Sequence, residues 1–364
     1  MVLTSTNAVH YLMERGLLDP SSVVDGDIVI LEAPRRNRNF KVIRRKQPGF
    51  FLKQVQKWDQ ASMATLQVEA HCYQLAASHP DFAALGGIMP RFYAYDASRS
   101  ILVTELVSDS ESVSEHQQRS GAFPVEIGAR LGEAFGLYHR ETRHKTYDAS
   151  VNSAFPRRVP WILSYHLTTP QYTSQLSGGN QQLLNLLQGY PAFARELDRI
   201  RTEWRPTTLI HGDIKWDNCI LHPNGGSQFA VKVVDWELAD WGDPCWDVAA
   251  IFSQYLSQWI HSLPLHTGLP PSQLVQMTQL PMGKLQPSLQ AFWLAYSKSL
   301  DLDSKAARML LERSVRYTGA RMIQTAYEYM QSQQQLTPTT PILLQACLNI
   351  LVEPKEAIAE LLGL

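Results

Sequence analysis

Strand-like patterns are concentrated in the first 107 residues, and helical patterns dominate the rest of the chain. Apolar and alternating runs separated by turn-forming residues predict five strands, at 27–32, 40–44, 50–55, 91–95 and 101–107. Apolar residues at helical spacing predict helices over 7–18 and 61–77. The first part of the chain is therefore expected to be a small antiparallel sheet with one main helix.

Beyond residue 107 the patterns change. The polar stretch 108–122 is predicted to be a loop, and 125–140 is predicted to be an amphipathic helix. One β-like island, at 208–234, interrupts a region that is otherwise helical. We predict an α+β, two-lobed fold, with a sheet-containing N-lobe at 1–107 and a larger, mainly helical C-lobe at 108–364.

Composition narrows the class of protein. Hydrophobic residues make up 45% of the 364 residues, which is enough for a packed core. Lys and Arg number 33 against 34 Asp and Glu, and this balance argues against a nucleic-acid partner, which needs surplus positive charge. No apolar run is long enough to span a bilayer, and the four cysteines form no C-x-x-C pair. We expect a cytoplasmic protein with no membrane partner.

The segment His-Gly-Asp-Ile-Lys-Trp-Asp-Asn, 211–218, carries the sharpest chemical signal. Its His-x-Asp-x-x-x-x-Asn spacing resembles the catalytic loop of kinases. In that chemistry Asp213 takes the proton of an acceptor hydroxyl, Asn218 points back to hold a metal ion, and His211 fixes the loop backbone. The alternative is a tight surface turn that happens to contain Asp and Asn.

A second acidic position follows at the end of an apolar strand. Val231–Val234 precede Asp235, and a kinase places its metal-binding aspartate at such a position. Asn218 and Asp235, on adjacent β segments, can share Mg²⁺, which prefers oxygen ligands. A helix cap or a turn cap is the alternative role for Asp235.

Together with Gly242-Asp243-Pro244 downstream, these motifs resemble the aminoglycoside phosphotransferase and choline kinase superfamily. Gly212 and the Gly242-Asp243-Pro244 segment separate the chain from ordinary eukaryotic protein kinases. The resemblance implies a protein-kinase-like fold and Mg²⁺-dependent transfer of phosphate from ATP or GTP to a hydroxyl. It implies that Asp247 supports the catalytic-loop backbone. For Asp243 and Glu237, a second metal contact and a capping role both remain open.

The resemblance also assigns roles in the first lobe. Lys53, in the third strand, is expected to contact the α- and β-phosphates, with Glu69 of the following helix as its ion-pair partner. Glu105 and Val107 are expected to bind the base through their backbone groups. The loop 33–39 contains no glycine, so Arg35, Arg36 and Arg38 either contact phosphates or form a solvated basic edge.

The sequence says less about the molecule that accepts the phosphoryl group than about the type of reaction. Lys215 lies two residues beyond Asp213, where serine/threonine protein kinases keep a lysine that contacts the γ-phosphate. This favours a peptide hydroxyl, as in lanthipeptide-type modification, over a small-molecule acceptor such as an aminoglycoside, a choline-like amine or a sugar. The alternative is that Lys215 is a surface lysine with no role in transfer. Nucleotidyl transfer and a non-catalytic pseudokinase are the further alternatives.

Overall fold

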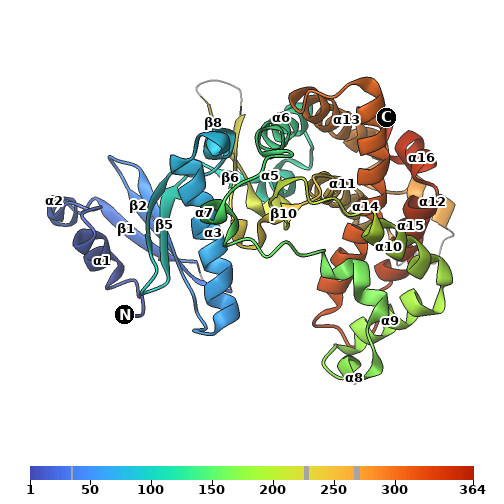
Figure 1. Cartoon of the computed structure of the whole chain (residues 1–364), viewed down its shortest axis with the longest axis horizontal. Coiled ribbons are helices and arrows are strands. Elements are labelled where there is room, and N and C mark those ends of the chain that lie inside the picture. The colour runs from blue at the N-terminus through green and yellow to red at the C-terminus, as the bar shows by residue number, and fades with distance from the viewer. Residues whose placement is uncertain (34–35, 225–228, 266–270) are drawn as a thin grey trace. The chain divides into compact units, whose positions relative to one another are not determined.

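The computed structural model describes residues 1–33, 36–224, 229–265 and 271–364 (Figure 1). The chain divides into two compact units. Unit 1 comprises Met1–His116, Thr146–Phe155 and Asp217–Ala239, and unit 2 comprises Gln117–Lys145, Pro156–Trp216 and Asp240–Leu364. Unit 1 is thus assembled from three separate stretches of sequence. The division of the chain into an N-lobe at 1–107 and a C-lobe at 108–364 stays a prediction.

A five-stranded antiparallel sheet forms the centre of unit 1. Its order is β1-β2-β3-β5-β4, with β1 (Ile28–Glu32), β2 (Arg38–Arg44), β3 (Gly49–Gln54), β4 (Phe92–Asp96) and β5 (Ile101–Leu106). All five predicted strands are present, within a few residues of their expected bounds. The central position of β3 matters for the site, because its side chains alternate between the two faces of the sheet.

Helices cover the two faces of this sheet. Helix α1 (Ala8–Glu14) packs Tyr11 and Leu12 against buried strand residues that include Phe40 and Leu52. Helix α3 (Gln60–Ser78) lies on the opposite face, where it meets Lys53. Helix α1 is shorter than the predicted 7–18 and is followed by α2 (Pro20–Val24), whereas α3 matches its prediction closely. Helix α4 (Ala83–Ile88) precedes β4.

Unit 1 also contains a three-stranded sheet, in the order β6-β8-β9. Its strands are β6 (Glu111–Ser112), β8 (Cys219–Pro223) and β9 (Phe229–Val233), and the short helix α7 (Ala149–Asn152) belongs to the same unit. The predicted loop at 108–122 is wrong. Ser112 and Glu115 exchange hydrogen bonds of 3.1 and 2.7 Å in a capping box, which starts helix α5 (Val113–Ser120).

Unit 2 is mainly helical, and helix α6 (Val125–Thr142) confirms the amphipathic prediction. Gly128 and Gly132 bring α6 against α13 (Met282–Ser299), where an added Cβ would lie 2.1 and 2.2 Å from the Ser288 and Phe292 carbonyl oxygens. The other described elements are α8 (Pro170–Thr173), α9 (Gly178–Gly189), α10 (Pro191–Thr202), α11 (Cys245–His261), α12 (Pro271–Gln276), α14 (Ser304–Met330), α15 (Thr339–Val352) and α16 (Pro354–Ala357), with the paired strands β7 (Thr208–Ile210) and β10 (Asp240–Gly242).

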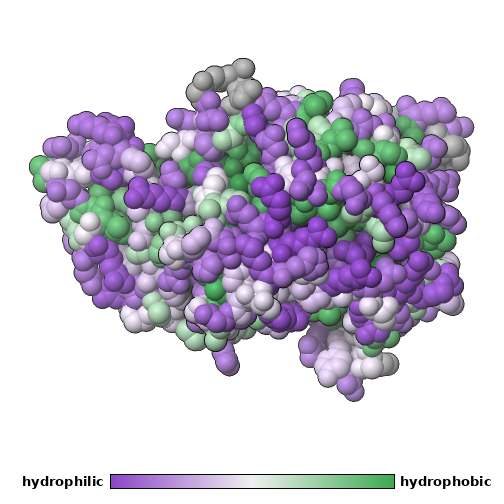
Figure 2. Space-filling view, turned by 45° about the horizontal axis from the view of Figure 1, so that its top comes forward, coloured by the Kyte–Doolittle hydropathy of each residue, from purple (hydrophilic) through white to green (hydrophobic). Residues whose placement is uncertain are grey.

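The surface mixes hydrophilic and hydrophobic residues. Hydrophilic residues predominate on the face drawn in Figure 2, and smaller hydrophobic areas lie between them. Within the described ranges, no helix has both the length and the apolar character needed to cross a bilayer.

Candidate active site

Unit 1 contains a cavity of about 360 Å³, within the range of ordinary ligand pockets. Strands β3 and β5, the residues after β5 and the segment around β8 and β9 supply most of its lining. Six of the predicted site residues line this one cavity: Lys53, Glu69, Glu105, Val107, Asn218 and Asp235. The fold thus brings together residues that lie up to 182 positions apart in the sequence.

Lys53 is a buried cation at the centre of three carboxylates. Its side chain is 7% exposed, and Nζ lies 2.6 Å from Glu69 Oε2, which is the pairing predicted from the sequence. Nζ also forms an ion pair with Asp235 Oδ1 and lies 3.7 Å from Glu237 Oε2. Burial by itself lowers the pKa of the lysine, but the three carboxylates outweigh burial and raise that pKa well above its usual range. Lys53 is therefore charged.

The carboxylates around Lys53 outnumber the cation. Burial raises the pKa of Glu69 to about 7. The attraction of Lys53 opposes this rise, and the negative charges of Asp235 and Glu237 add to it. Among the described residues that line the cavity, five are acidic (Glu69, Glu105, Asp217, Asp235 and Glu237) and three are basic (Arg36, Lys41 and Lys53). The cavity has a surplus of negative charge, so an anionic ligand such as a nucleotide needs a further cation to bind there.

Asn218 and Asp235 lie side by side just beyond paired strands. Cys219 of β8 pairs with Val233 of β9, and the next N–H, from Val234, donates to the Asn218 carbonyl at 3.0 Å. Asp235 has φ 69° and ψ 52°, a left-handed conformation that is uncommon outside glycine. This backbone turns the chain immediately after the strand and places the carboxylate in the Lys53 cluster.

The residues at this position fit a magnesium ion. Oxygen atoms of Glu69, Asp235 and Glu237 all lie within 4.8 Å of one another, and the buried Asn218 lines the same cavity. Carboxylate and amide oxygens are the ligands that Mg²⁺ prefers. The prediction named Asn218 and Asp235, and the geometry adds Glu237, for which the sequence left two roles open.

Glu105 and Val107, which are predicted to bind the base, use part of their backbone in hydrogen bonds within the protein. The Glu105 N–H donates to the Arg91 carbonyl at 2.8 Å, and the Val107 carbonyl accepts from Ser110 Oγ at 2.8 Å. Base binding by the backbone groups of Glu105 and Val107 stays a prediction.

Unit 2 holds the His211–Lys215 loop, which follows β7. Asp247, buried in helix α11, accepts from the His211 N–H at 2.7 Å and from the Gly212 N–H at 3.0 Å, which is the contact predicted for it. Burial by itself raises the pKa of Asp247, but its contact with His139 and the hydrogen bond from Tyr138 help to outweigh burial and lower that pKa. Asp247 therefore stays ionised and anchors the loop.

Two further features set the path of this loop. Gly212 has φ 81°, a conformation that a side chain would strain, so the second position of the motif requires glycine. The Asp213 N–H donates to His211 Nδ1 at 3.3 Å, which places the predicted histidine against the loop backbone. The Trp246 indole N–H donates to the Gly212 carbonyl at 3.2 Å.

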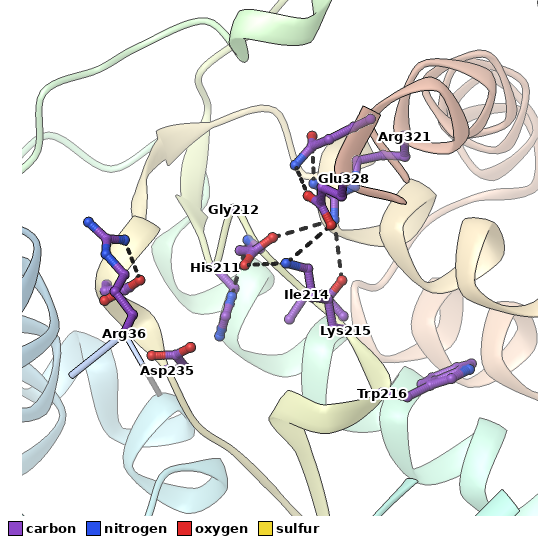
Figure 3. Close-up of polar contacts among 12 residues, drawn as sticks. Arg36, His211, Gly212, Ile214, Lys215, Trp216, Asp235, Arg321 and Glu328 are labelled. Atoms are coloured by element: carbon purple, nitrogen blue, oxygen red, sulfur yellow. Dashed lines mark hydrogen bonds and ion pairs between the residues drawn. The ribbon is translucent and has the colours of Figure 1, made fainter. Parts of the chain in front are cut away.

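The Asp213 carboxylate is flanked by cations. Lys215 Nζ lies 3.2 Å from Asp213 Oδ2 and 3.4 Å from Glu328, and Arg321 lies 3.8 Å from Asp213 Oδ1 (Figure 3). Arg321 and Glu328 come from helix α14, about a hundred residues downstream, and sequence reasoning missed both. Their spacing on one face of a helix is visible in the sequence, but nothing there connects them with the loop.

The sequence left the roles of several residues open. Arg36 donates to Glu237 at 2.9 Å and lines the cavity with a side chain that is 56% exposed, so both of its predicted roles stay open (Figure 3). Arg35 lies outside the described residues. Asp243 is buried and accepts from the Cys245 N–H at 3.0 Å and from Arg313 at 3.1 Å, which favours the capping role over a metal contact.

The charge imbalance around Lys53 leads to a stability prediction. We expect Lys53→Ala to lower the free energy of unfolding by about 3–5 kcal/mol, because it leaves several carboxylates without their cation. Glu69→Ala should cost clearly less, since Asp235 remains beside Lys53. Both variants should weaken ATP–Mg²⁺ binding, and Lys53→Ala should weaken it more than Glu69→Ala. Denaturant unfolding and calorimetry measure the two effects.

Lys41 supplies the control, because this exposed lysine lines the same cavity from the adjacent strand β2. Lys41→Ala should change stability by less than about 0.5 kcal/mol. A Glu69→Ala variant with unaltered stability and nucleotide affinity would show that the Lys53–Glu69 pair contributes nothing.

A small antiparallel sheet carrying a Lys–Glu pair, joined to a mainly helical part with an anchored His-Gly-Asp loop, defines a two-lobed kinase-like fold. The chain belongs to the phosphotransferase enzyme family, whose model matches residues 27–268. This confirms the predicted superfamily and, at the level of the family, the predicted enzyme class.

Solved structures agree on the fold. The streptomycin–ATP–APH(2″)-IIa ternary complex matches with a TM-score of 0.50 and 13% identity, over 96% of this chain and 99% of that chain. The ADP-bound aminoglycoside phosphotransferase APH(2″)-Ib also matches with a TM-score of 0.50 and 13% identity, over 92% and 99% of the two chains.

A curated relative matches over a shorter stretch. "Acyl-CoA dehydrogenase family member 10" of Mus musculus is 37% identical over 81 residues, which is 22% of this chain. The match spans only 7% of the length of that mouse protein.

Proposed function

We propose that this protein is a Mg²⁺-dependent phosphotransferase that moves the γ-phosphoryl group of ATP or GTP onto a hydroxyl. The observation that carries the proposal is the buried Lys53, paired with Glu69 and Asp235 inside a cavity of nucleotide-binding size. A kinase uses this combination to hold the phosphates and their metal ion. The family to which the chain belongs supports the same reaction class.

The six predicted residues that line the cavity, together with Glu237, each have a role in this proposal. Lys53 binds the α- and β-phosphates, and Glu69 holds the lysine in place. Asn218, Asp235 and Glu237 would hold Mg²⁺, which would neutralise phosphate charge when bound. The Glu105 carbonyl and the Val107 N–H bind the base.

Asp213 is proposed to orient the acceptor hydroxyl and accept its proton as the bond to phosphorus forms. His211, Gly212 and Asp247 hold the loop that carries it. Lys215 contacts the Asp213 carboxylate and is proposed to contact the transferring phosphate. Burial lowers the pKa of Lys215, but the nearby carboxylates outweigh burial and raise that pKa, so the lysine is charged.

The alternatives differ in their observable products. A pseudokinase would lack one of Lys53, Asp213, Asn218 or Asp235, and this chain retains all four. Nucleotidyl transfer would use the same residues but would attach AMP, so the mass of the modified acceptor distinguishes it from phosphoryl transfer. The direct test incubates a panel of acceptors with labelled ATP and with labelled GTP. If no acceptor hydroxyl becomes labelled, the proposal is contradicted.

The panel should contain both classes of acceptor. Lys215 favours Ser/Thr peptides, while the solved structure with streptomycin and ATP makes small hydroxylated molecules equally worth testing. We expect Lys215→Ala to slow transfer by about 10²-fold with little change in nucleotide affinity, because its charge acts mainly on the transition state. Single-turnover transfer to peptides and to small alcohols measures this.

The exposed Lys298, on α13, supplies the control variant Lys298→Ala, which should behave like the wild type. Peptide phosphorylation that collapses in Lys215→Ala would support the peptide assignment. Transfer only to small molecules, unimpaired in Lys215→Ala, would instead assign a small-molecule acceptor and remove the proposed role of Lys215.

A further inference from the structure

Helix α14 brings a row of three polar side chains to the His211–Lys215 loop. Arg321, Gln324 and Glu328 follow one another at spacings of three and four residues, which places them on the same face of the helix. Figure 3 shows Arg321 and Glu328 on this helix, on the side of the loop that carries Ile214 and Lys215. Both helix and loop belong to unit 2.

Arg321 is a buried cation with a specific set of contacts. Its side chain is 4% exposed, and its guanidinium lies 5.1 Å from the centre of the Trp246 ring. It donates to the Ile214 carbonyl at 3.3 Å and to Gln324 Oε1 at 3.1 Å, and it lies 3.8 Å from Asp213 Oδ1. Burying a guanidinium is costly unless its partners compensate, so these contacts fix its position relative to the loop.

The row closes into a ring of side chains. Gln324 Nε2 donates to Glu328 Oε1 at 3.0 Å, and Glu328 Oε2 lies 3.4 Å from Lys215 Nζ. Lys215 in turn lies 3.2 Å from Asp213 Oδ2. The two oxygens of the Asp213 carboxylate therefore face different cations, with Arg321 on Oδ1 and Lys215 on Oδ2.

We propose that Arg321 is the positioning residue for the Asp213 carboxylate, which it holds from helix α14 while Glu328 holds Lys215. This inference rests on the proposed function, in which Asp213 accepts the proton of the acceptor. A carboxylate on a loop can rotate about its side-chain bonds, and proton acceptance requires one oxygen in a defined orientation. A buried guanidinium on a 27-residue helix provides that fixed reference point.

The test is a double-mutant cycle between Arg321→Met and Asp213→Asn. Methionine keeps apolar contact with Trp246 but removes the charge. The reaction followed is single-turnover release of ADP from ATP–Mg²⁺ with water as the acceptor, and affinity for ADP–Mg²⁺ is measured by calorimetry. We expect Arg321→Met to lower the rate by about 10–100-fold and the affinity by less than about 2-fold. In the Asp213→Asn background the same substitution should add less than about 2-fold.

The matched control is Arg316→Met, on the same helix. Arg316 is also partly buried and pairs with Glu203 at 3.4 Å and Glu312 at 2.6 Å. If Arg321→Met and Arg316→Met lower the rate equally, Arg321 contributes only to the stability of the helix and the inference is overturned. An undiminished effect of Arg321→Met in the Asp213→Asn background would overturn it too, because the arginine would then act independently of the carboxylate.

Arg321→Lys provides a second cycle that retains the charge if the methionine variant does not fold. Lysine cannot reach both the Ile214 carbonyl and Asp213 as a planar guanidinium does, so we expect partial activity, again dependent on Asp213. An activity equal to that of the wild type would contradict the positioning role. Failure of the proposed function itself gives a different result, because Asp213→Asn alone would then remain active.

Discussion

Asp213→Asn is expected to lower phosphoryl transfer by about 10²–10⁴-fold, the usual contribution of a positioned general base. The amide keeps the size of the carboxylate but cannot accept the proton of the acceptor. Asp213 belongs to unit 2, whereas the residues proposed to bind nucleotide line a cavity built from unit 1. Affinity for ATP–Mg²⁺ should therefore change by less than about 2-fold, as calorimetry can measure.

Loss of the folded structure of the loop would not explain the lower transfer rate of Asp213→Asn. Arg321 would keep its hydrogen bonds to Ile214 and Gln324, and the loop backbone would keep its contacts with Asp247. Asp301→Asn is the control, because Asp301 is an exposed acidic residue of the same unit and does not line the cavity. Retention of more than about a tenth of the wild-type rate in Asp213→Asn would remove the aspartate from its assigned role.

Asp235→Ala is expected to lower metal-dependent turnover by about 10³-fold, which corresponds to several kcal/mol of transition-state stabilisation. The reason is the charge balance of the cavity, in which acidic residues outnumber basic ones and a nucleotide adds further negative charge. Titration of Mg²⁺ and Mn²⁺ against the rate should show that the variant requires far more metal than the wild type. Excess chelator should abolish wild-type activity.

Glu69→Ala separates this effect from the loss of a Lys53 partner. Both substitutions remove a carboxylate that contacts Lys53, but Glu69 is proposed to act mainly by holding the lysine. The metal requirement should therefore shift more in Asp235→Ala than in Glu69→Ala. Full activity of the wild type in excess chelator would contradict the metal-dependent mechanism.

Much of the fold could be predicted from local patterns, and the residues of the candidate site from the catalytic-loop motif and the family resemblance. The five strands of the first sheet, helices α3 and α6, and the loop around Asp213 each depend on residues close together in sequence. The Lys53–Glu69 pair was predictable only through the resemblance to the aminoglycoside phosphotransferase and choline kinase superfamily, which implies a lysine in the third strand and a glutamate partner in the following helix. The helix α5 was missed because its start depends on the Ser112–Glu115 capping box inside a polar stretch that contains few apolar residues.

The surroundings of Asp213 could not be predicted in this way. Arg321 and Glu328 reach the loop only because α14 packs along it, and helical periodicity says which residues share a face but not what that face contacts. The same holds for Glu237, whose place between Arg36 and Lys53 depends on the left-handed turn at Asp235.

The sequence by itself determined the order of strands and helices, the spacing within the His-Gly-Asp loop and the chemical groups available for phosphoryl transfer. These follow from periodicity and from residue types at short range. Only the tertiary structure decided which charges balance one another, because ion pairs between distant segments depend on packing. Packing of distant segments places Lys53 beside three carboxylates and places Asp213 beside two cations.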